Sequence, residues 1–197
     1  MKLVELTTIP AEAVPVAGFK DHLRLGSGFS DDGLQDETLG GFLRAAMAAI
    51  EARTGKVLIE RSFSWSVAAW RDVSRQALPL APVSEILAIA QVDRFGAETV
   101  VPEGTIGLEQ DVQRPAVVAL EGCLPSIPVG GAVRIELRAG FGPSWGDLPP
   151  DLAQSVMMLA AHFYEYRHES ATASLPFGVA ALIERYRTVR IMMGGRG

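Results

Sequence analysis

The chain has 197 residues, of which 48% are hydrophobic and 21% are charged, and its formal net charge is −5. These proportions are ordinary for a soluble globular protein and argue against extensive disorder. The single cysteine, Cys123, excludes an intramolecular disulfide and a zinc site built from cysteines, and a chain of this length can bury a core without either.

The charge is unevenly distributed along the chain. Residues 184–197 contain four arginines and one glutamate, a local charge of +3, so residues 1–183 hold the remaining −8. Because phosphate binding depends on Lys and Arg, such an acidic body does not attract nucleic acid. The first fifteen residues lack the long apolar stretch of a secretory signal, and no run approaches the roughly 20 apolar residues of a membrane helix. We therefore expect a soluble protein that is made in the cytosol and does not enter a membrane.

The first region, roughly residues 17–54, is predicted to be helical. Phe19–Leu25 is expected to form a short helix or turn, and the polar residues Ser30–Gly33 offer N-cap chemistry for the next element. Apolar residues then recur at the helical spacing of three and four: Leu39, Phe42, Leu43, Ala46 and Ile50. This spacing predicts a helix from about Asp36 to Thr54, with Gly55 as its C-terminal stop.

The second region, roughly residues 57–140, has the pattern of short strands. Two segments alternate apolar and polar residues, which is typical of strands with one buried face; their apolar residues are Phe63, Trp65 and Val67 in one and Val133, Ile135 and Leu137 in the other. Val83–Asp93 is predicted to be a strand that turns at residues 94–97 into Glu98–Val101, and Ala116–Leu120 is another. Prolines separate these segments, which suggests a small sandwich or a partly open barrel.

The third region returns to helix. Pro149, Pro150 and Asp151 are typical of a helix start, and an apolar stripe follows: Leu152, Val156, Leu159, Phe163 and Tyr166. A second helix is predicted from about Val179 to Arg190. The fold class predicted from this order is α+β, with a helical bundle from residues 1–56 and 146–197 and an antiparallel β-rich insertion at residues 57–145.

Both long helices lack a polar face for solvent. Opposite the buried stripe of the first helix lie Ala45, Ala48 and Ala52, and opposite that of the second lie Met157, Ala161 and Tyr164. A helix that is apolar nearly all round is normally buried. Two hypotheses remain open at this point: neighbouring subunits cover these faces, or the chain's own β region and C-terminal helix cover them.

The sequence contains no convincing catalytic, metal or cofactor site. Glu165 and His168 have the Glu-x-x-His spacing of di-iron bundles, but those need two copies of the motif and only one is present. No His-Glu-x-x-His and no phosphate-binding glycine motif occurs. Residues 142–146 read Gly-Pro-Ser-Trp-Gly, but no helix follows them immediately, as a Gly-x-Ser-x-Gly nucleophile elbow requires. Trp65 and Trp70 could stack on a sugar or a base, although packing in the core explains them more simply. We therefore expect no enzyme activity and no cofactor.

Several stretches, in this order and spacing, resemble one known family over about residues 20 to 190. The chain resembles the head–tail connector (adaptor) proteins of long-tailed phages and of phage-derived gene transfer agents. The stretches are Ser30-Asp31-Asp32, Ala45 to Gly55, Leu78 to Val83, Val92 to Ala97, Arg138 to Gly142, Leu148 to Leu152, His162 to Arg167, Leu175 to Val179, and Tyr186-Arg187.

The resemblance implies a structural virion protein located at the neck of the particle and made in the cytoplasm of a bacterial host. It implies a homo-oligomeric ring, commonly of twelve subunits, that joins the portal of the head to the next tail-joining protein, a stopper or terminator. DNA would pass through the ring without specific binding. Two rivals stay open: a head-completion or tail-terminator ring, and a small enzyme with a cleft between its helical and β regions.

On this interpretation two sets of residues are candidate contacts. The C-terminal arginines either complement the negative end of a helix or dock on a partner such as the portal. The candidate docking residues are Arg185, Arg187, Arg190, Ile191, Met192 and Met193. The candidate subunit interface consists of Ala45, Ala48, Ala52, Met157, Ala161 and Tyr164.

Overall fold

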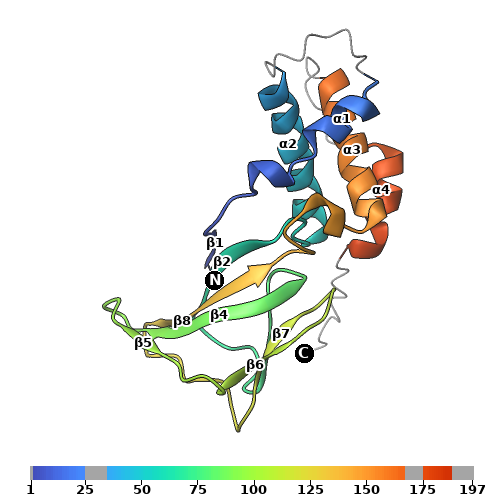
Figure 1. The fold of residues 1–197 in the computed structure, drawn as a ribbon. Coiled ribbons are helices and arrows are strands. Elements are labelled where there is room, and N and C mark those ends of the chain that lie inside the picture. Colours follow the sequence, from blue (N-terminus) through green and yellow to red (C-terminus); the bar gives the residue numbers. More distant parts are fainter. Residues whose placement is uncertain (1, 25–34, 167–174, 188–197) are drawn as a thin grey trace.

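The structure is a computed structural model that describes residues 2–24, 35–166 and 175–187, and its helices and strands occupy separate parts of the molecule (Figure 1). The α-helices are α1 (Val16–His22), α2 (Asp36–Thr54), α3 (Pro150–Glu165) and α4 (Phe177–Ile183). The strands are β1 (Lys2–Glu5), β2 (Arg61–Val67), β3 (Arg75–Ala77), β4 (Val83–Val92), β5 (Glu98–Val100), β6 (Ile106–Glu109), β7 (Ala116–Ala119) and β8 (Ala132–Ala139). The predicted α+β class is confirmed. No helix of the described part is both long enough and apolar enough to span a bilayer.

The helical part is built on the pair α2 and α3, with α1 against α2 and α4 against α3. The predicted bounds of α2 are confirmed, and the chain leaves it through Gly55 in the left-handed conformation, with φ of 69°. Its buried residues repeat at helical spacing: Leu39, Leu43, Ala46, Met47 and Ile50. The proposed N-cap residues 30–33 lie outside the described residues.

The five-stranded sheet has the strand order β1-β2-β8-β4-β5, and every neighbouring pair is antiparallel. Both predicted alternating strands lie in it, and they are paired directly, with Phe63 opposite Leu137 and Trp65 opposite Ile135. All of these side chains are buried. The predicted hairpin between β4 and β5 is also present, closed by a hydrogen bond from Asp93 N–H to the carbonyl of Ala97.

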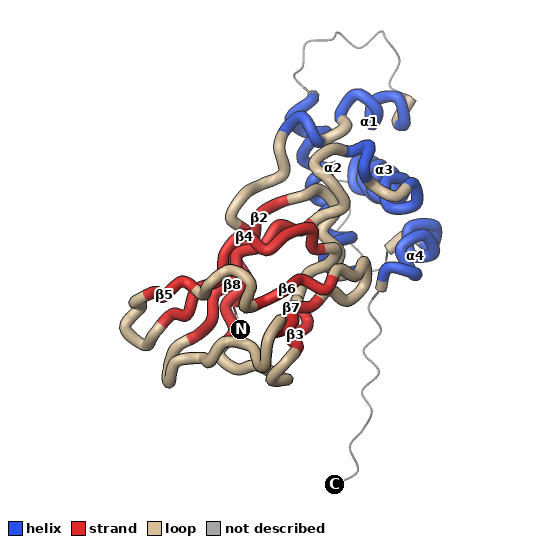
Figure 2. The backbone as a smooth tube through the Cα atoms, turned by 60° about the horizontal axis from the view of Figure 1, so that its bottom comes forward, coloured by secondary structure: helices blue, strands red, loops and turns tan. Residues whose placement is uncertain are grey.

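A second, three-stranded sheet has the order β3-β7-β6. Its central residue Val117 packs with Trp65 and Leu124 in one apolar core, which is separate from the core of the helical part. Within the described residues the two sheets do not close into a barrel. Figure 2 shows the strands gathered at one end of the molecule and the helices at the other.

Three elements differ from the prediction. β1 was not predicted; it adds a strand from the N-terminal segment 1–56 to the sheet of the insertion, with Lys2 opposite Ser66. α1 begins at Val16, three residues before the predicted start. α4 ends at Ile183 and not near Arg190, because a single 3-10 turn, Glu184–Tyr186, follows it and buries the ring of Tyr186.

The junction between the two parts is held by a buried ion pair. Glu51, in the last turns of α2, accepts two hydrogen bonds from the guanidinium of Arg61 on β2, at 3.2 and 2.9 Å, and one from the N–H of Leu58 at 2.8 Å. Arg61 also lies 3.1 Å from Glu5 of β1, and its side chain is only 4% exposed. This bidentate geometry fixes the direction in which the sheet leaves α2.

Candidate assembly surfaces

The small-residue face of α2 has no cover within the described residues. Ala45, Ala48 and Ala52 are all exposed, and so is Gly41 one turn earlier. The opposite side of the same helix is completely buried against α1 and α3. Small side chains would allow another backbone to approach this face closely.

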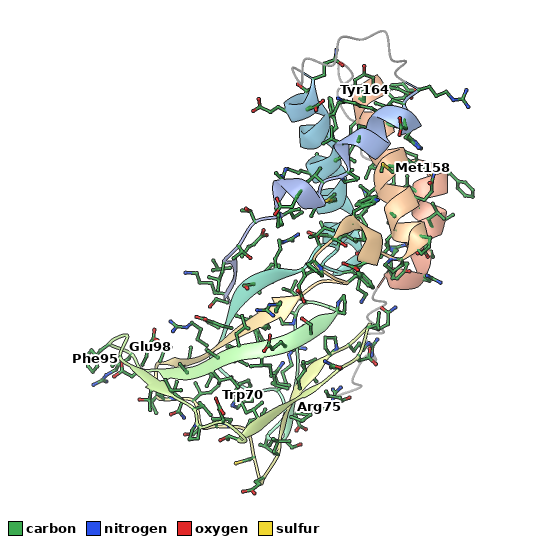
Figure 3. The ribbon with its side chains drawn as sticks, in the orientation of Figure 1. Trp70, Arg75, Phe95, Glu98, Met158 and Tyr164 are labelled. Carbon is green, nitrogen blue, oxygen red and sulfur yellow. The ribbon has the colours of Figure 1, made fainter. Side chains whose placement is uncertain are left out.

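The corresponding face of α3 is already half-buried by the chain itself. The ring of Tyr164, labelled in Figure 3, meets Phe42 of α2 edge-on, with 5.9 Å between the ring centroids. The terminal methyl of Met157 lies next to Gly18 of α1, and Ala161 packs at the edge of the helical core. On α3, therefore, the chain itself covers part of the apolar face.

Of the candidate docking residues, the structure describes only Arg185 and Arg187. Arg185 pairs through Nε with Asp151 Oδ2 at 2.8 Å, and Arg187 pairs with Glu184 at 2.9 Å. Both arginine side chains remain more than half exposed, at 67% and 55%, so each can meet a further carboxylate. Arg190, Ile191, Met192 and Met193 lie outside the described residues.

Burial sets the ionisation of Tyr186 beneath these arginines. Desolvation raises the pKa of the Tyr186 phenol above its ordinary value, although the neighbouring Arg185 opposes that rise. The hydrogen bond to the phenol, in turn, raises the pKa of Arg185. At neutral pH the phenol is therefore uncharged and the guanidinium is charged, which suits a structural contact.

The β part of the molecule has an exposed apolar tip that the predicted sites do not include. Phe95, at the turn between β4 and β5, is 80% exposed, and Val129 in a neighbouring loop is 95% exposed. The guanidinium of Arg94 lies 4.6 Å from the centroid of the Phe95 ring. Figure 3 shows Phe95 at the end of the sheet that lies far from the helices. The only sequence signal for it is a large apolar residue in a hairpin turn.

In the described part of the chain, the residues considered for chemistry do not come together in one site. No group of three or more metal-ligating side chains occurs in the described part of the chain, and His168 falls outside that part. Trp65 is 1% exposed in the core, while Trp70 is half-buried and donates its indole N–H to the carbonyl of Pro125. Lys56 is buried at the junction, where desolvation lowers its pKa, and its ammonium donates to the carbonyl of Gln113.

No protein-family model and no curated protein matches this chain. Solved structures do match it, over its whole length. One is described as the neck of an empty GTA particle computed with C6 symmetry: identity is 53%, the TM-score is 0.90, and all of both chains is covered. The chain belongs to the neck proteins of gene transfer agent particles.

Two further structures agree with this assignment of the neck protein. A chain in the virion of a native gene transfer agent (GTA) particle is 54% identical, with a TM-score of 0.87 over 98% of this chain and 99% of that one. A chain in the neck of a native GTA particle, computed with C12 symmetry, is 50% identical, with a TM-score of 0.85 over all of both chains. The resemblance inferred from the order of the motifs is confirmed, and the neck protein is a structural component of the particle.

Proposed function

We propose that this neck protein forms a homo-oligomeric ring of twelve copies that joins the portal of the head to the next tail-joining protein. The observation that supports it best is the match along the full length, at 53% and 50% identity, to chains in particle necks computed with C6 and C12 symmetry. In a symmetric ring each subunit uses two different surfaces, and the first surface of one copy contacts the second surface of the next copy.

The small-residue face of α2 is the first candidate for such a surface. Ala45, Ala48 and Ala52 are exposed on a helix whose other side is buried, and nothing in the described residues explains that composition. A neighbouring copy would bury this face at little cost in side-chain entropy, because alanine has no rotamers to lose. On α3 the contribution would be smaller, because Met157 and Tyr164 already pack within the chain.

The arginine end is the candidate contact for the portal. Arg185 and Arg187 face solvent even while paired within the chain. An acidic partner could therefore add a second carboxylate to each, and Arg190 with Ile191, Met192 and Met193 would extend the same contact. Exposed pairs of this kind contribute more to orientation and to the rate of encounter than to affinity.

The acidic body suits a conduit for DNA. Residues 1–183 have a net charge of −8, and negative charge around a channel repels phosphate and so prevents DNA from adhering to the wall. The protein would then act mechanically, without catalysis and without a cofactor.

Electron microscopy of purified particles, with this chain located by its density, tests the function. We expect rotationally related copies between the portal and the tail. Copies at the far end of the tail tube would identify a terminator, and single copies away from the neck would refute the ring. Turnover of a small molecule that is lost on changing one side chain would favour the enzyme alternative.

A truncation tests the portal contact separately. Removing residues 188–197 keeps Tyr186 and its buried contacts, so the body should fold as before. We expect rings that no longer attach to heads. Normal joining of heads and tails by the truncated protein would refute the role of Arg190 and Met192, and would leave the ring itself untouched.

A further inference from the structure

The five-stranded sheet has two open edges at its opposite ends. β1 is the outermost strand on one side and β5 is the outermost strand on the other, and all of their residues are exposed. Within the described residues no strand pairs with the outer edge of either. An exposed strand edge with apolar side chains is a template for pairing with another chain.

The backbone groups that point outward from these edges follow from the hydrogen bonds inside the sheet. Leu6 N–H donates to the carbonyl of Ser62, so the backbone groups of Leu6 point toward β2. Because this direction alternates from one residue to the next, the N–H and C=O groups of Leu3 and Glu5 in β1 point outward. On the other edge Val101 N–H donates to Ile89, so Glu98 and Val100 point outward.

The side chains on one face of the sheet are complementary at the two edges. Directly opposed residues share a face, and one such row crosses the whole sheet: Lys2, Ser66, Arg134, Ala90 and Val100. By alternation Val4 and Glu98 lie on this same face. One edge therefore presents a cation and a valine, and the other presents a carboxylate and a valine.

We propose that β1 of one copy pairs with β5 of the next copy in the ring, with Lys2 beside Glu98 and Val4 beside Val100. This inference rests on the ring proposed above and names a second surface for it. Because four successive antiparallel pairings separate them, β1 and β5 run in the same direction. Copies related by rotation would therefore pair these strands in parallel.

The backbone geometry agrees with this register. In a parallel pair, an outward-pointing residue bonds to the two residues that flank its neighbour on the facing strand. Val100 N–H would then donate to the carbonyl of Leu3, and Glu5 N–H would donate to the carbonyl of Val100. A shift of one residue would place Lys2 and Glu98 on opposite faces of the joint sheet and lose the charge pairing.

The opposed positions of the two edges explain why the product would be a ring. β1 and β5 are different surfaces at the two ends of one sheet, so each copy offers one edge to each neighbour. Such a head-to-tail contact closes into a ring when a whole number of copies completes one full turn. Glu98 also pairs with Arg134 in its own chain, so Lys2 would join an existing cluster of charges and not an isolated carboxylate.

Cross-linking within assembled particles tests the proposal. In a background with the exposed Cys123 changed to Ser, the double variant Val4→Cys and Val100→Cys is treated with a short bismaleimide. We expect a ladder of covalent multimers on a denaturing gel, and no multimer from either single variant. Multimers from Val4→Cys alone would show β1 paired with its own copy and would overturn the proposal.

A second pair of variants separates backbone pairing from side-chain packing. Leu3→Pro removes one outward N–H without removing a hydrogen bond between β1 and β2, and Leu3→Ala keeps that N–H. We expect Leu3→Pro to abolish the cross-linked ladder of the double-cysteine protein and Leu3→Ala to retain it. If rings are visible by microscopy but the double-cysteine protein gives no ladder, only the pairing of β1 with β5 is refuted. If no rings form, the proposed function is refuted as well.

Discussion

The hydroxyl of Tyr186 donates a hydrogen bond to Oδ1 of Asp151 across 2.8 Å, which joins the turn after α4 to the first turn of α3. Arg185 contacts the other carboxylate oxygen, and Gln113 of the β insertion donates to the carbonyl of Arg185. The ring of Tyr186 also meets Phe141 edge-on. This cluster fixes the position of Arg185 and of the turn that leads to Arg187, the two described members of the candidate portal contact.

Replacement of Tyr186 by Phe tests the contribution of this cluster to stability. The variant keeps the buried ring but loses two hydrogen bonds of the hydroxyl, one donated to Asp151 and one accepted from Arg185, while Asp151 and Arg185 still pair with each other. We expect the free energy of unfolding to fall by about 1 to 2 kcal/mol, since each such bond usually contributes about 1 kcal/mol. Denaturant unfolding measures it, and an unchanged midpoint would show that solvent replaces both bonds without cost.

The same variant makes a prediction about alkaline pH. Burial raises the pKa of Tyr186, so its phenol ionises in the unfolded chain at a lower pH than in the folded one. The resulting stability is fully present below the unfolded pKa, about 10, and is lost as the pH rises through the folded pKa. The difference in stability between wild type and Tyr186→Phe should therefore shrink above pH 10. Unfolding curves of both proteins between pH 8 and about 11 would show it.

Removal of the Arg61 side chain should loosen the junction between the two parts. In Arg61→Met the carboxylate of Glu51, 16% exposed, keeps only the N–H of Leu58 as a hydrogen-bond donor. Breaking a buried pair from one side costs about 3 to 5 kcal/mol.

Arg138→Met is the matched control for that change, because its pair with Glu85 is exposed and should contribute less than about 1 kcal/mol. Equal destabilisation of the two variants would contradict the role given to Arg61.

Two glycines should respond very differently to alanine. At Gly140, with φ of 142°, a Cβ would lie 2.3 Å from the backbone Cα of Glu60, so the backbone after β8 or before β2 would have to move. At Gly55 a Cβ meets nothing within 4 Å, and only the left-handed backbone is strained. We expect Gly55→Ala to cost about 1 kcal/mol and Gly140→Ala to cost several times more, as measured by thermal or denaturant unfolding. Similar costs would contradict the close approach at Gly140.

Arginine at Ala48 should block assembly without unfolding the chain. Ala48 is exposed on α2, and arginine is a good helix former, so the stability of the isolated chain should change by less than about 0.5 kcal/mol. We expect the number of copies per particle neck to fall sharply.

Ala181→Arg makes the same change at an exposed alanine of α4, outside the surfaces proposed for the ring, and should leave the rings intact. Normal rings with Ala48→Arg would exclude the small-residue face of α2 as an interface.

Several elements could be predicted because their periodicity reports burial directly. α2 was predicted to its terminal residues, since its apolar spacing runs from Leu39 to Ile50 and Gly55 ends it. The alternating strands at Phe63 and Val133 were recognised for the same reason. The stripe on α3 was predicted less well: Leu152 is buried, but Tyr166 at its end is 48% exposed.

Other features could not be predicted because they depend on residues far away in the sequence. β1 is four residues long, has no turn signals around it, and exists through its pairing with Ser64 and Ser66, 60 and 64 positions after their partners Val4 and Lys2. The end of α4 is set by the contact of Tyr186 with Asp151, and no local pattern near Ile183 indicates it.

By itself the sequence determined the α+β class, the bounds of its most periodic elements, and the family, because amphipathic spacing and the order of short motifs are local properties. Only the tertiary structure decided which apolar faces remain exposed, since burial depends on what packs against a residue. It left Ala48 uncovered while turning Tyr164 toward Phe42. It also placed β1 and β5 at opposite ends of one sheet, because strand order is fixed by long-range pairing and not by any local stretch of chain.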